Sequence, residues 1–207
     1  MKLAIIGGGV KGIALLKQLK DNFKTSDIKL YEKNSKIGGV WANIHKVPYQ
    51  SIQIIPRHYR FINFKNRNSV KSDDLYNYLI EYININNLQD HIYLNSNITE
   101  IKDEKLKING EYLYFDYIFI TGRNSRKNIP EKYKKYYNYE NPSNKIFHSS
   151  ELNQQILNKM SEDSVKCVVI GGSKSSADAI LNINKKNTKW IARRYNRFAE
   201  FNKKNTF

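Results

Sequence analysis

The sequence has only one cysteine, Cys167, among its 207 residues. A single cysteine excludes an internal disulfide and a redox-active cysteine pair, and its place in an apolar stretch suits a reducing cytoplasm. The chain also lacks any run near the roughly 18 apolar residues that a membrane helix needs. Its first apolar run, about four residues long, is too short for the core of a signal peptide. We therefore expect a soluble, cytoplasmic protein.

Clusters of chemically reactive side chains are also absent. The four histidines, His45, His58, His91 and His148, lie in separate segments of the sequence. Their spacing is not that of metal ligands, and no Ser/His/Asp triad is visible. We therefore expect no metal site and no nucleophilic triad.

Acidic residues are few, since 19 Asp and Glu face 35 Lys and Arg, for a formal net charge of +16. Such an excess raises the question of a nucleic-acid partner. The lysines are scattered through every segment, however, and no base-reading motif accompanies them. Hydrophobic residues at 40% and aromatics at 13% are enough for a packed core. We therefore expect a globular protein, and a basic nucleic-acid-binding protein is the least favoured of three hypotheses.

A pattern of buried strand, glycine turn and helix occurs twice, in LAIIGGGVKGIALL at 3–16 and in VVIGGSKSSADAI at 168–180. Apolar residues at helical spacing predict a helix over 10–20, and DIKLYEKN predicts a second strand ending at Glu32. Continuous apolar strands separated by helices are typical of parallel sheets covered on both faces. The sequence therefore predicts an α/β fold with Rossmann-like units.

The remaining segments complete this outline. Ser72, followed by two acidic residues, predicts the start of a helix. HIYLNSNITEI predicts two short strands, KLKINGEYLYF predicts a hairpin that turns at Asn109, and FDYIFITG predicts a buried strand ending on Gly122. ELNQQILNKM predicts a helix before the second glycine turn, and TKWIARR predicts a strand after it. We expect a first domain over 1–150, with a parallel sheet and a β-meander, and part of a second over 151–207.

Gly7, Gly9 and Gly12 form G-x-G-x-x-G between a strand and a helix, the context that this motif requires. The first glycine allows the turn, the second lets a pyrophosphate approach the backbone, and the third lets the helix sit close to the strand. The helix N-terminus then offers unpaired N–H groups to the phosphates. Glu32, about 20 residues further on, is placed to bind a ribose. The spacing predicts a site for FAD or a nicotinamide dinucleotide; the alternative is a purely structural turn and a surface glutamate.

The second turn carries serines where the first has glycines; its residues are Gly171, Gly172, Ser173, Ser175 and Ser176. Serine is small and keeps a hydroxyl donor near a phosphate. The strand that follows ends in Arg193 and Arg194 instead of an acid. An arginine pairs with a 2′-phosphate that an acid would repel, so this half favours NADP(H). Two solvated surface arginines are the alternative.

These segments carry a family resemblance over nearly the whole chain. GGGVKG, LYEKNSKIGGVW, FDYIFITG followed by NIP, HSSEL, VVIGGSKSSAD and WIARR, in this order, resemble the flavin-containing monooxygenases. The string E-K-N-x-x-I-G-G-x-W at 32–41 is the most specific part. Members of that family continue well past the segment that matches WIARR. The resemblance therefore implies that 151–207 is only the start of the NADPH-binding domain.

The resemblance also implies roles for individual residues. Those that would hold FAD are Gly7, Gly9, Gly12, Glu32, Lys33, Gly39 and Trp41, with Thr121 and Gly122 closing over it and the Ile98 backbone beside adenine. Trp41 as a core aromatic is the alternative from the residues alone. The second turn, with Gly171, Ser173, Ser175, Ser176, Arg193 and Arg194, would hold NADPH. The family places an amide near the flavin, and Gln53 is the nearest candidate for this catalytic role.

The activity that the resemblance implies is oxygenation. NADPH reduces the flavin, the reduced flavin captures dioxygen as a C4a-hydroperoxide, and a soft nitrogen or sulfur nucleophile takes the distal oxygen. A non-catalytic or vestigial FAD- and NAD(P)-binding protein is the second hypothesis. The residues leave open whether the chain forms a homo-oligomer or needs a second chain that completes the fold.

Overall fold

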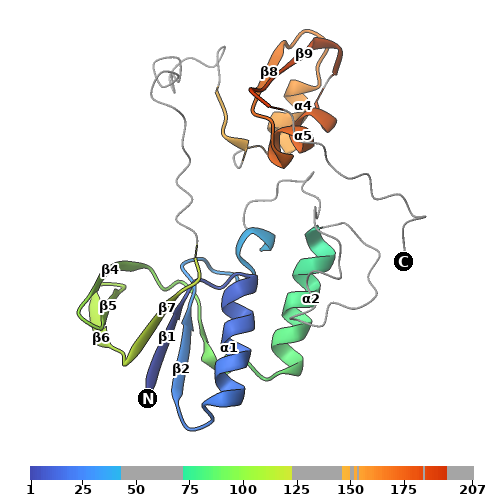
Figure 1. Cartoon of the computed structure of the whole chain (residues 1–207). Coiled ribbons are helices and arrows are strands. Elements are labelled where there is room, and N and C mark those ends of the chain that lie inside the picture. The colour runs from blue at the N-terminus through green and yellow to red at the C-terminus, as the bar shows by residue number, and fades with distance from the viewer. Residues whose placement is uncertain (43–71, 123–145, 150–151, 153, 184, 195–207) are drawn as a thin grey trace. The chain divides into compact units, whose positions relative to one another are not determined.

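The structure is a computed structural model. It describes residues 1–42, 72–122, 146–149, 152, 154–183 and 185–194. These residues belong to two compact units, the first containing 1–42 and 72–122 and the second everything described from 146 onward (Figure 1). Each unit has a parallel sheet and helices, so the predicted α/β class is confirmed. The predicted domain boundary at residue 150 lies outside the described residues and stays a prediction.

The first unit is built on a four-stranded sheet with the order β3-β2-β1-β7. The strands are β1 (Lys2–Ile6), β2 (Asp27–Tyr31), β3 (Ile92–Tyr93) and β7 (Tyr117–Ile120), and all of their pairings are parallel. Leu3, Ala4 and Ile5 of the inner strand β1 are almost completely buried. Burial on both faces explains why this strand reads as an unbroken apolar run.

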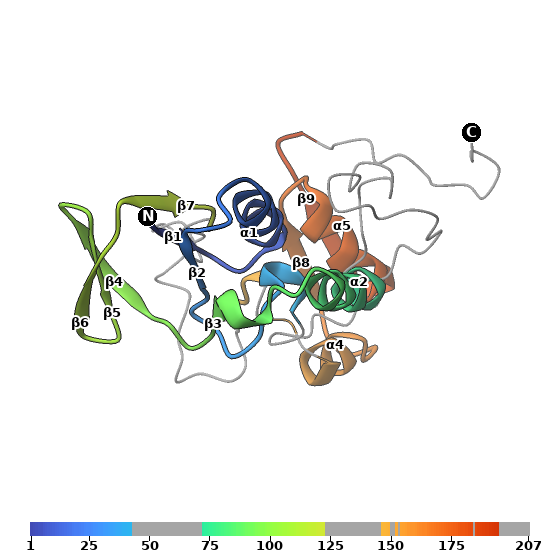
Figure 2. The ribbon, with the colours of Figure 1, turned by 90° about the horizontal axis from the view of Figure 1, so that it is seen from below.

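Two helices cover one face of this sheet (Figure 2). Helix α1 (Val10–Asn22) follows β1 directly, and helix α2 (Ser72–Ile85) precedes β3. Apolar residues at helical spacing turn one side of each helix inward, and all are buried: Ile13, Leu16 and Leu19 in α1, and Leu75, Leu79 and Ile83 in α2. Both helices were predicted, α1 from this spacing and α2 from Ser72 and the two acidic residues that follow it.

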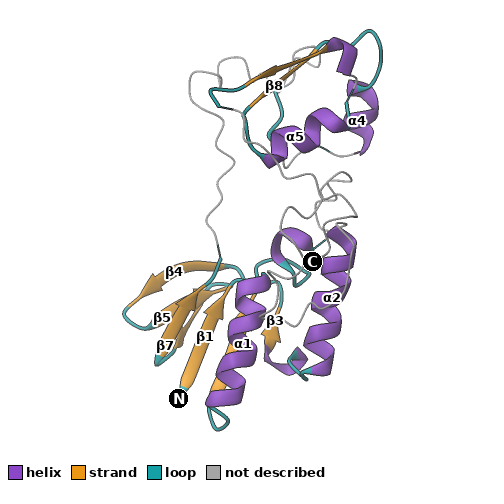
Figure 3. Ribbon diagram, turned by 45° about the vertical axis from the view of Figure 1, so that its right-hand side comes forward, coloured by secondary structure: helices purple, strands orange, loops and turns teal. Residues whose placement is uncertain are grey.

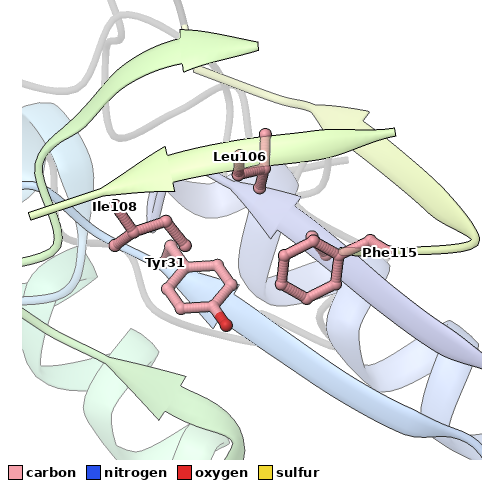
Figure 4. Close-up of a cluster of buried hydrophobic side chains, with 5 residues drawn as sticks. Tyr31, Leu106, Ile108 and Phe115 are labelled. Atoms are coloured by element: carbon pink, nitrogen blue, oxygen red, sulfur yellow. The ribbon is translucent and has the colours of Figure 1, made fainter. Parts of the chain in front are cut away.

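A three-stranded antiparallel meander covers the other face. It consists of β4 (Ile98–Lys102), β5 (Lys105–Ile108) and β6 (Glu111–Tyr114), in that order. Figure 4 shows the cluster of buried side chains that joins the meander to the sheet: Ala4, Tyr31, Leu106, Ile108 and Phe115. Burial raises the pKa of the Tyr31 hydroxyl to about 12. The first unit therefore has three layers, with the parallel sheet in the middle.

The hairpin between β5 and β6 turns at the predicted place. Asn109 has φ +50° and Gly110 has φ +97°, the two left-handed conformations that a tight two-residue turn needs. Asn109 also accepts a hydrogen bond from the backbone N–H of Asn97 at 2.9 Å. This turn thus fixes the register of the meander and ties it to the start of β4.

The prediction that β7 is a buried strand is wrong, because Tyr117 and Ile120 are exposed. β7 pairs with β1 on one side and is the last strand of the sheet within the described residues. An apolar run predicts two covered faces, but a strand at the edge of a sheet can leave part of its surface open. Ile118 is the residue of β7 that packs against the meander cluster.

The second unit is a single strand–helix–strand unit with a further helix before it (Figure 3). Its elements are α4 (Gln154–Met160), β8 (Cys167–Ile170), α5 (Lys174–Leu181) and β9 (Thr188–Ile191), and the two strands are parallel. Cys167 packs with Leu157 and Ile183 in the core of this unit. Burial raises the pKa of the Cys167 thiol, which favours the inert thiol form.

Strand β8 was also predicted to be buried, and this is half wrong. Cys167 faces the core, whereas Val168 and Ile170 are exposed. Side chains alternate between the two faces of a strand, and the described residues of this unit cover only one face.

Three short 3₁₀ turns also lie among the described residues: η1 (Gly39–Trp41), η4 (Gln89–His91) and η6 (Lys185–Asn187). None of the helices described above combines the length and the apolarity that a bilayer crossing requires. The cytoplasmic location stays a prediction.

Candidate functional site

The first glycine turn joins the end of β1 to the start of α1, and two of its glycines are required by the fold itself. Gly7 has φ +104°, and a Cβ atom added there would lie 2.8 Å from the backbone nitrogen of Gly122. A Cβ atom at Gly12 would lie 2.0 Å from the carbonyl oxygen of Gly7. Both positions therefore need glycine whether or not a ligand binds.

Gly9 is different. Its φ of −78° suits any residue. Of the residues that the structure describes, a Cβ atom added there would meet only Gly39, whose Cα lies at an ordinary distance of 3.9 Å. Gly9 is also the N-cap of α1, which has no side-chain cap and no acidic residue in its first turn. The space beside Gly9 is therefore open next to unpaired N–H groups at a helix N-terminus, a setting that fits a phosphate group.

Glu32 follows the last residue of β2 and is buried beside this turn. Its Oε2 accepts a hydrogen bond from the Gly8 N–H at 2.7 Å. Its Oε1 accepts hydrogen bonds from the backbone and the side-chain amide of Asn34, at 2.9 and 2.7 Å. The carboxylate thus has a fixed position at the carboxyl end of the sheet, and the alternative of a surface glutamate is wrong.

The turn from Gly38 to Trp41 lies against the first glycine turn. Gly38 donates a backbone hydrogen bond to the Gly8 carbonyl at 2.7 Å. Gly39 has φ +59°, and a Cβ atom on it would lie 2.9 Å from the Cα of Gly9. Trp41 is half-buried, and Lys33 is exposed. Two glycine-rich segments about 30 residues apart therefore meet at backbone contact.

Thr121 and Gly122 close the other side of the first turn. The Thr121 hydroxyl lies 3.0 Å from the Ile6 carbonyl and 2.9 Å from the Gly7 carbonyl, and it donates to this pair. The backbone N–H groups of Thr121 and Gly122 both donate to Ile6. The end of β7 is thus joined to the turn that follows β1.

The segment before Ile98 reaches the same edge of the sheet. Ser96 donates a backbone hydrogen bond to the Glu32 carbonyl at 2.9 Å, and Asn95 donates one to Asn34 at 3.0 Å. The side chain of Ile98 packs toward the meander cluster. The structure therefore brings one set of the predicted residues together at this edge of the sheet: Gly7, Gly9, Gly12, Glu32, Gly39, Thr121 and Gly122. Gln53 lies outside the described residues.

The second turn is held against the end of β9. Gly171 has φ +130° and donates its N–H to the Ile191 carbonyl at 2.9 Å, while the Trp190 indole N–H donates to the Gly171 carbonyl at 2.5 Å. A Cβ atom at Gly172 would lie 1.8 Å from the carbonyl oxygen of Arg194. The backbone that carries the two arginines therefore passes directly over the turn.

The serines of the second turn have different surroundings. Ser173 is the N-cap of α5 and is exposed, as is Ser175. Ser176 is buried, and its hydroxyl donates to the Ser173 carbonyl at 2.6 Å. The proton of the Ser176 hydroxyl is thus used within the turn. Arg193 and Arg194 are both exposed.

Solved structures match the chain in fold. OTEMO in complex with FAD and NADP is 16% identical, with a TM-score of 0.68 over 93% of this chain and 38% of that one. Tmm from Pelagibacter sp. strain HTCC7211 is 22% identical, with a TM-score of 0.66 over 93% and 50%. S-allyl-L-cysteine S-oxygenase from Allium sativum is 18% identical, with a TM-score of 0.64 over 92% and 50%. This is the fold of the flavin-containing monooxygenases.

The match to the flavin-containing monooxygenases is one of structure. No protein-family model matches the sequence, and no curated protein sequence matches it. The chain spans between 38% and 50% of the length of the three solved structures named above. Among the described residues, no group of three or more His, Cys, Asp or Glu side chains could hold a metal ion.

Within this monooxygenase fold, four residues have roles that the sequence did not indicate. A Cβ atom at Gly8 would lie 2.2 Å from Cδ1 of Ile37 and 3.0 Å from the Glu32 carboxylate, and one at Gly172 would lie 1.8 Å from the Arg194 carbonyl oxygen. Gly8 and Gly172 are each the second glycine of a Gly-Gly doublet, and this shared doublet was the sequence signal that could have identified them. Asn34, which holds Glu32, and Tyr76, which packs on Gly38, had no comparable signal.

Proposed function

We propose that this chain is an FAD- and NADPH-dependent monooxygenase, or the N-terminal portion of one, with FAD at the first glycine turn and NADPH at the second. The observation that carries the proposal is the open space at Gly9, the one motif glycine of the first turn that the fold does not itself require. OTEMO, which shares this fold, is in complex with FAD and NADP, and this supports the same pair of cofactors.

In this proposal the first unit holds FAD by its pyrophosphate and ribose. The phosphates lie at the N-terminus of α1, where backbone N–H groups and the helix dipole stabilise negative charge. Glu32 accepts hydrogen bonds from the ribose hydroxyls. The other residues assigned to this site are Gly7, Gly9, Gly12, Lys33, Gly39, Trp41, Ile98, Thr121 and Gly122.

The second unit holds NADPH in the same way, with Gly171, Ser173, Ser175 and Ser176 at the phosphates. Arg193 and Arg194 stand where an NAD-binding unit carries an acid, and a guanidinium pairs with the 2′-phosphate. The contact between Gly172 and the Arg194 carbonyl holds this backbone beside the turn.

When bound, the flavin supplies hydride acceptance and the activation of dioxygen. The chain's own contribution is to bind and orient the two dinucleotides and to keep water from the reacting centre. We assign a soft nitrogen or sulfur nucleophile as the substrate, and the S-oxygenase among the structural neighbours favours sulfur. Gln53 remains the predicted catalytic amide.

The test compares Gly9→Ala with the wild-type protein. Among the described residues, an alanine at position 9 meets no atom closer than 3.9 Å, so we expect the apoprotein to keep its thermal midpoint. The added methyl group occupies the space of the pyrophosphate, and we expect the FAD dissociation constant to rise about tenfold or more. Flavin absorbance between 350 and 500 nm and quenching of flavin fluorescence measure binding. Unchanged FAD affinity in this variant would contradict the assignment.

A dinucleotide-binding protein without turnover is the second candidate, because the open space beside Gly9 at the N-terminus of α1 supports binding of a dinucleotide by itself. The two candidates differ in one measurement. A monooxygenase consumes NADPH together with oxygen once FAD is bound, whereas the non-catalytic protein binds FAD and leaves NADPH unoxidised.

A further inference from the structure

Tyr76 lies on helix α2, next to the turn from Gly38 to Trp41. Its neighbours Leu75 and Leu79 have no exposed surface, so the first half of α2 is anchored in the core. Tyr76 itself is half-buried. A Cβ atom added at Gly38 would lie 3.0 and 3.1 Å from Cδ2 and Cε2 of its ring. The ring edge therefore packs directly on the backbone of Gly38.

The opposite side of this turn packs on the first glycine turn. A Cβ atom at Gly39 would lie 2.9 Å from the Cα of Gly9, and the Gly38 N–H donates to Gly8. Both Gly38 and Gly39 have positive φ, at +122° and +59°. Glycine populates this region at no steric cost, so the turn has little conformational preference of its own. Its position depends on the two surfaces that enclose it, which are the Tyr76 ring and the Gly8–Gly9 backbone.

We infer that Tyr76 is a positioning residue for the FAD pyrophosphate: its ring sets how closely the Gly38–Trp41 turn approaches Gly9, and so sets the width of the space beside Gly9. This inference rests on the proposed binding of FAD at the first glycine turn. Tyr76 acts through the turn and not by contact with the cofactor. The hydroxyl has no part in this role, because the ring carbons make the contact with Gly38.

Three variants on one helix test the inference. Tyr76→Phe keeps the ring edge, and Tyr76→Ala removes it. Tyr82→Ala is the matched control, since Tyr82 is also half-buried on α2 and its ring lies 6.4 Å from the ring of Tyr78. Position 82 is six residues further along the helix, about 9 Å from position 76 along the axis. Each variant is measured in the full chain, as apoprotein for thermal unfolding and by fluorescence titration for the FAD dissociation constant.

We expect Tyr76→Phe to bind FAD within about twofold of wild type and Tyr76→Ala to bind about tenfold more weakly or worse. Tyr82→Ala lowers the thermal midpoint by a comparable amount and leaves the FAD dissociation constant within about twofold. If Tyr76 had a purely structural role, Tyr76→Ala would lower the thermal midpoint and leave the FAD dissociation constant unchanged. If Tyr76→Ala does not fold, Tyr76→Leu keeps apolar volume on the helix without the ring edge and is expected to show the same loss of affinity.

A double-mutant cycle with Gly38→Ala examines the contact directly. The methyl group at position 38 meets the Tyr76 ring in the wild-type background and loses this contact in Tyr76→Ala, whereas it lies 3.3 Å from the backbone nitrogen of Ala42 in both backgrounds. The strain of an alanine at positive φ is present in both backgrounds and cancels in the cycle. We expect Gly38→Ala to raise the FAD dissociation constant at least about threefold more in the wild-type background than in Tyr76→Ala.

The outcomes separate the inference from the function on which it rests. If the wild-type protein binds no FAD, the proposed function is wrong, and the inferred role of Tyr76 is then also wrong. Wild-type protein that binds FAD, together with unchanged affinity in Tyr76→Ala or strictly additive effects in the cycle, overturns the role of Tyr76 alone.

Discussion

At the scale of single residues, the glycines of the first turn are required for different reasons. Gly12 lies under the start of α1, where a Cβ atom would be 2.0 Å from the Gly7 carbonyl oxygen, too close for any adjustment of a side chain to relieve. Gly9 has room for a methyl group. The motif G-x-G-x-x-G therefore combines positions that maintain the fold with a position that leaves space for a ligand.

This difference predicts opposite effects on stability. Gly12→Ala forces α1 away from the turn, and we expect the free energy of unfolding to fall by about 1–3 kcal/mol, the usual cost of overpacking, or more. Gly9→Ala is neutral or slightly stabilising, because alanine at a compatible φ reduces the entropy of the unfolded chain. Urea unfolding of both apoproteins, followed by circular dichroism, measures the two values. Equal losses in the two variants would refute the distinction.

The sequence predicted those residues whose role follows from local spacing. Gly7, Gly9, Gly12 and Glu32 could be named because strand, turn and helix place them at fixed offsets. Asn34 and Tyr76 could not, because their roles depend on where a side chain from one segment meets the backbone of another. Such contacts have no local periodicity and appear only when the tertiary structure is known.

At the scale of elements, the meander is held to the parallel sheet mainly by Leu106 and Ile108 of β5 and by Phe115. Phe115 follows β6, is 3% exposed and stacks edge-on with Tyr31, with ring centroids 5.9 Å apart. Its neighbour Tyr114 is 50% exposed. Adjacent residues of similar size thus have opposite environments.

These two neighbours make a matched pair of variants. Phe115→Ala removes a buried ring between the sheet and the meander, and we expect the free energy of unfolding to fall by about 3–5 kcal/mol. Tyr114→Ala removes an exposed ring and should change it by about 0.5 kcal/mol or less. Chemical unfolding of the two variants under the same conditions gives the comparison. A loss in Tyr114→Ala as large as that in Phe115→Ala would show that the cluster does not join these layers.

The elements themselves were largely predictable, whereas their burial was not. Periodicity indicated α1, the capping serine and acidic first turn indicated α2, and the Asn109-Gly110 dipeptide indicated the hairpin. Strands β7 and β8 were expected to be buried because they are apolar throughout, yet each leaves residues exposed. The position of a strand within its sheet decides how many of its faces are covered, and that position depends on the pairing of distant segments.

At the scale of the whole molecule, the proposal assigns the two compact units to two different dinucleotides. The first turn is followed by the buried acid Glu32 and the second by the exposed Arg193 and Arg194. The sites are therefore expected to respond independently to substitution.

Replacing both arginines tests this assignment. A guanidinium pairs with a 2′-phosphate through charge-assisted hydrogen bonds, so we expect Arg193→Ala/Arg194→Ala to weaken NADPH binding about tenfold or more. NADH, which has no 2′-phosphate, should bind as it does to the wild type, and FAD affinity should not change. Fluorescence titrations with NADPH and with NADH give the ratio of the two dissociation constants. The same NADPH affinity before and after substitution would mean that the two side chains are merely solvated.

The Thr121 hydroxyl that reaches the Ile6 and Gly7 carbonyls has a consequence for biosynthesis. Gly7 and Thr121 are 114 positions apart, so the first turn stays unclosed for most of the translation of the first unit. At about 5–20 residues per second, the ribosome needs about 6–23 s to add the intervening chain. During this interval β1 lacks its neighbour β7 and exposes backbone groups that can pair with other nascent chains. The protection of β1 by chaperones is therefore expected to end only after Thr121 has emerged.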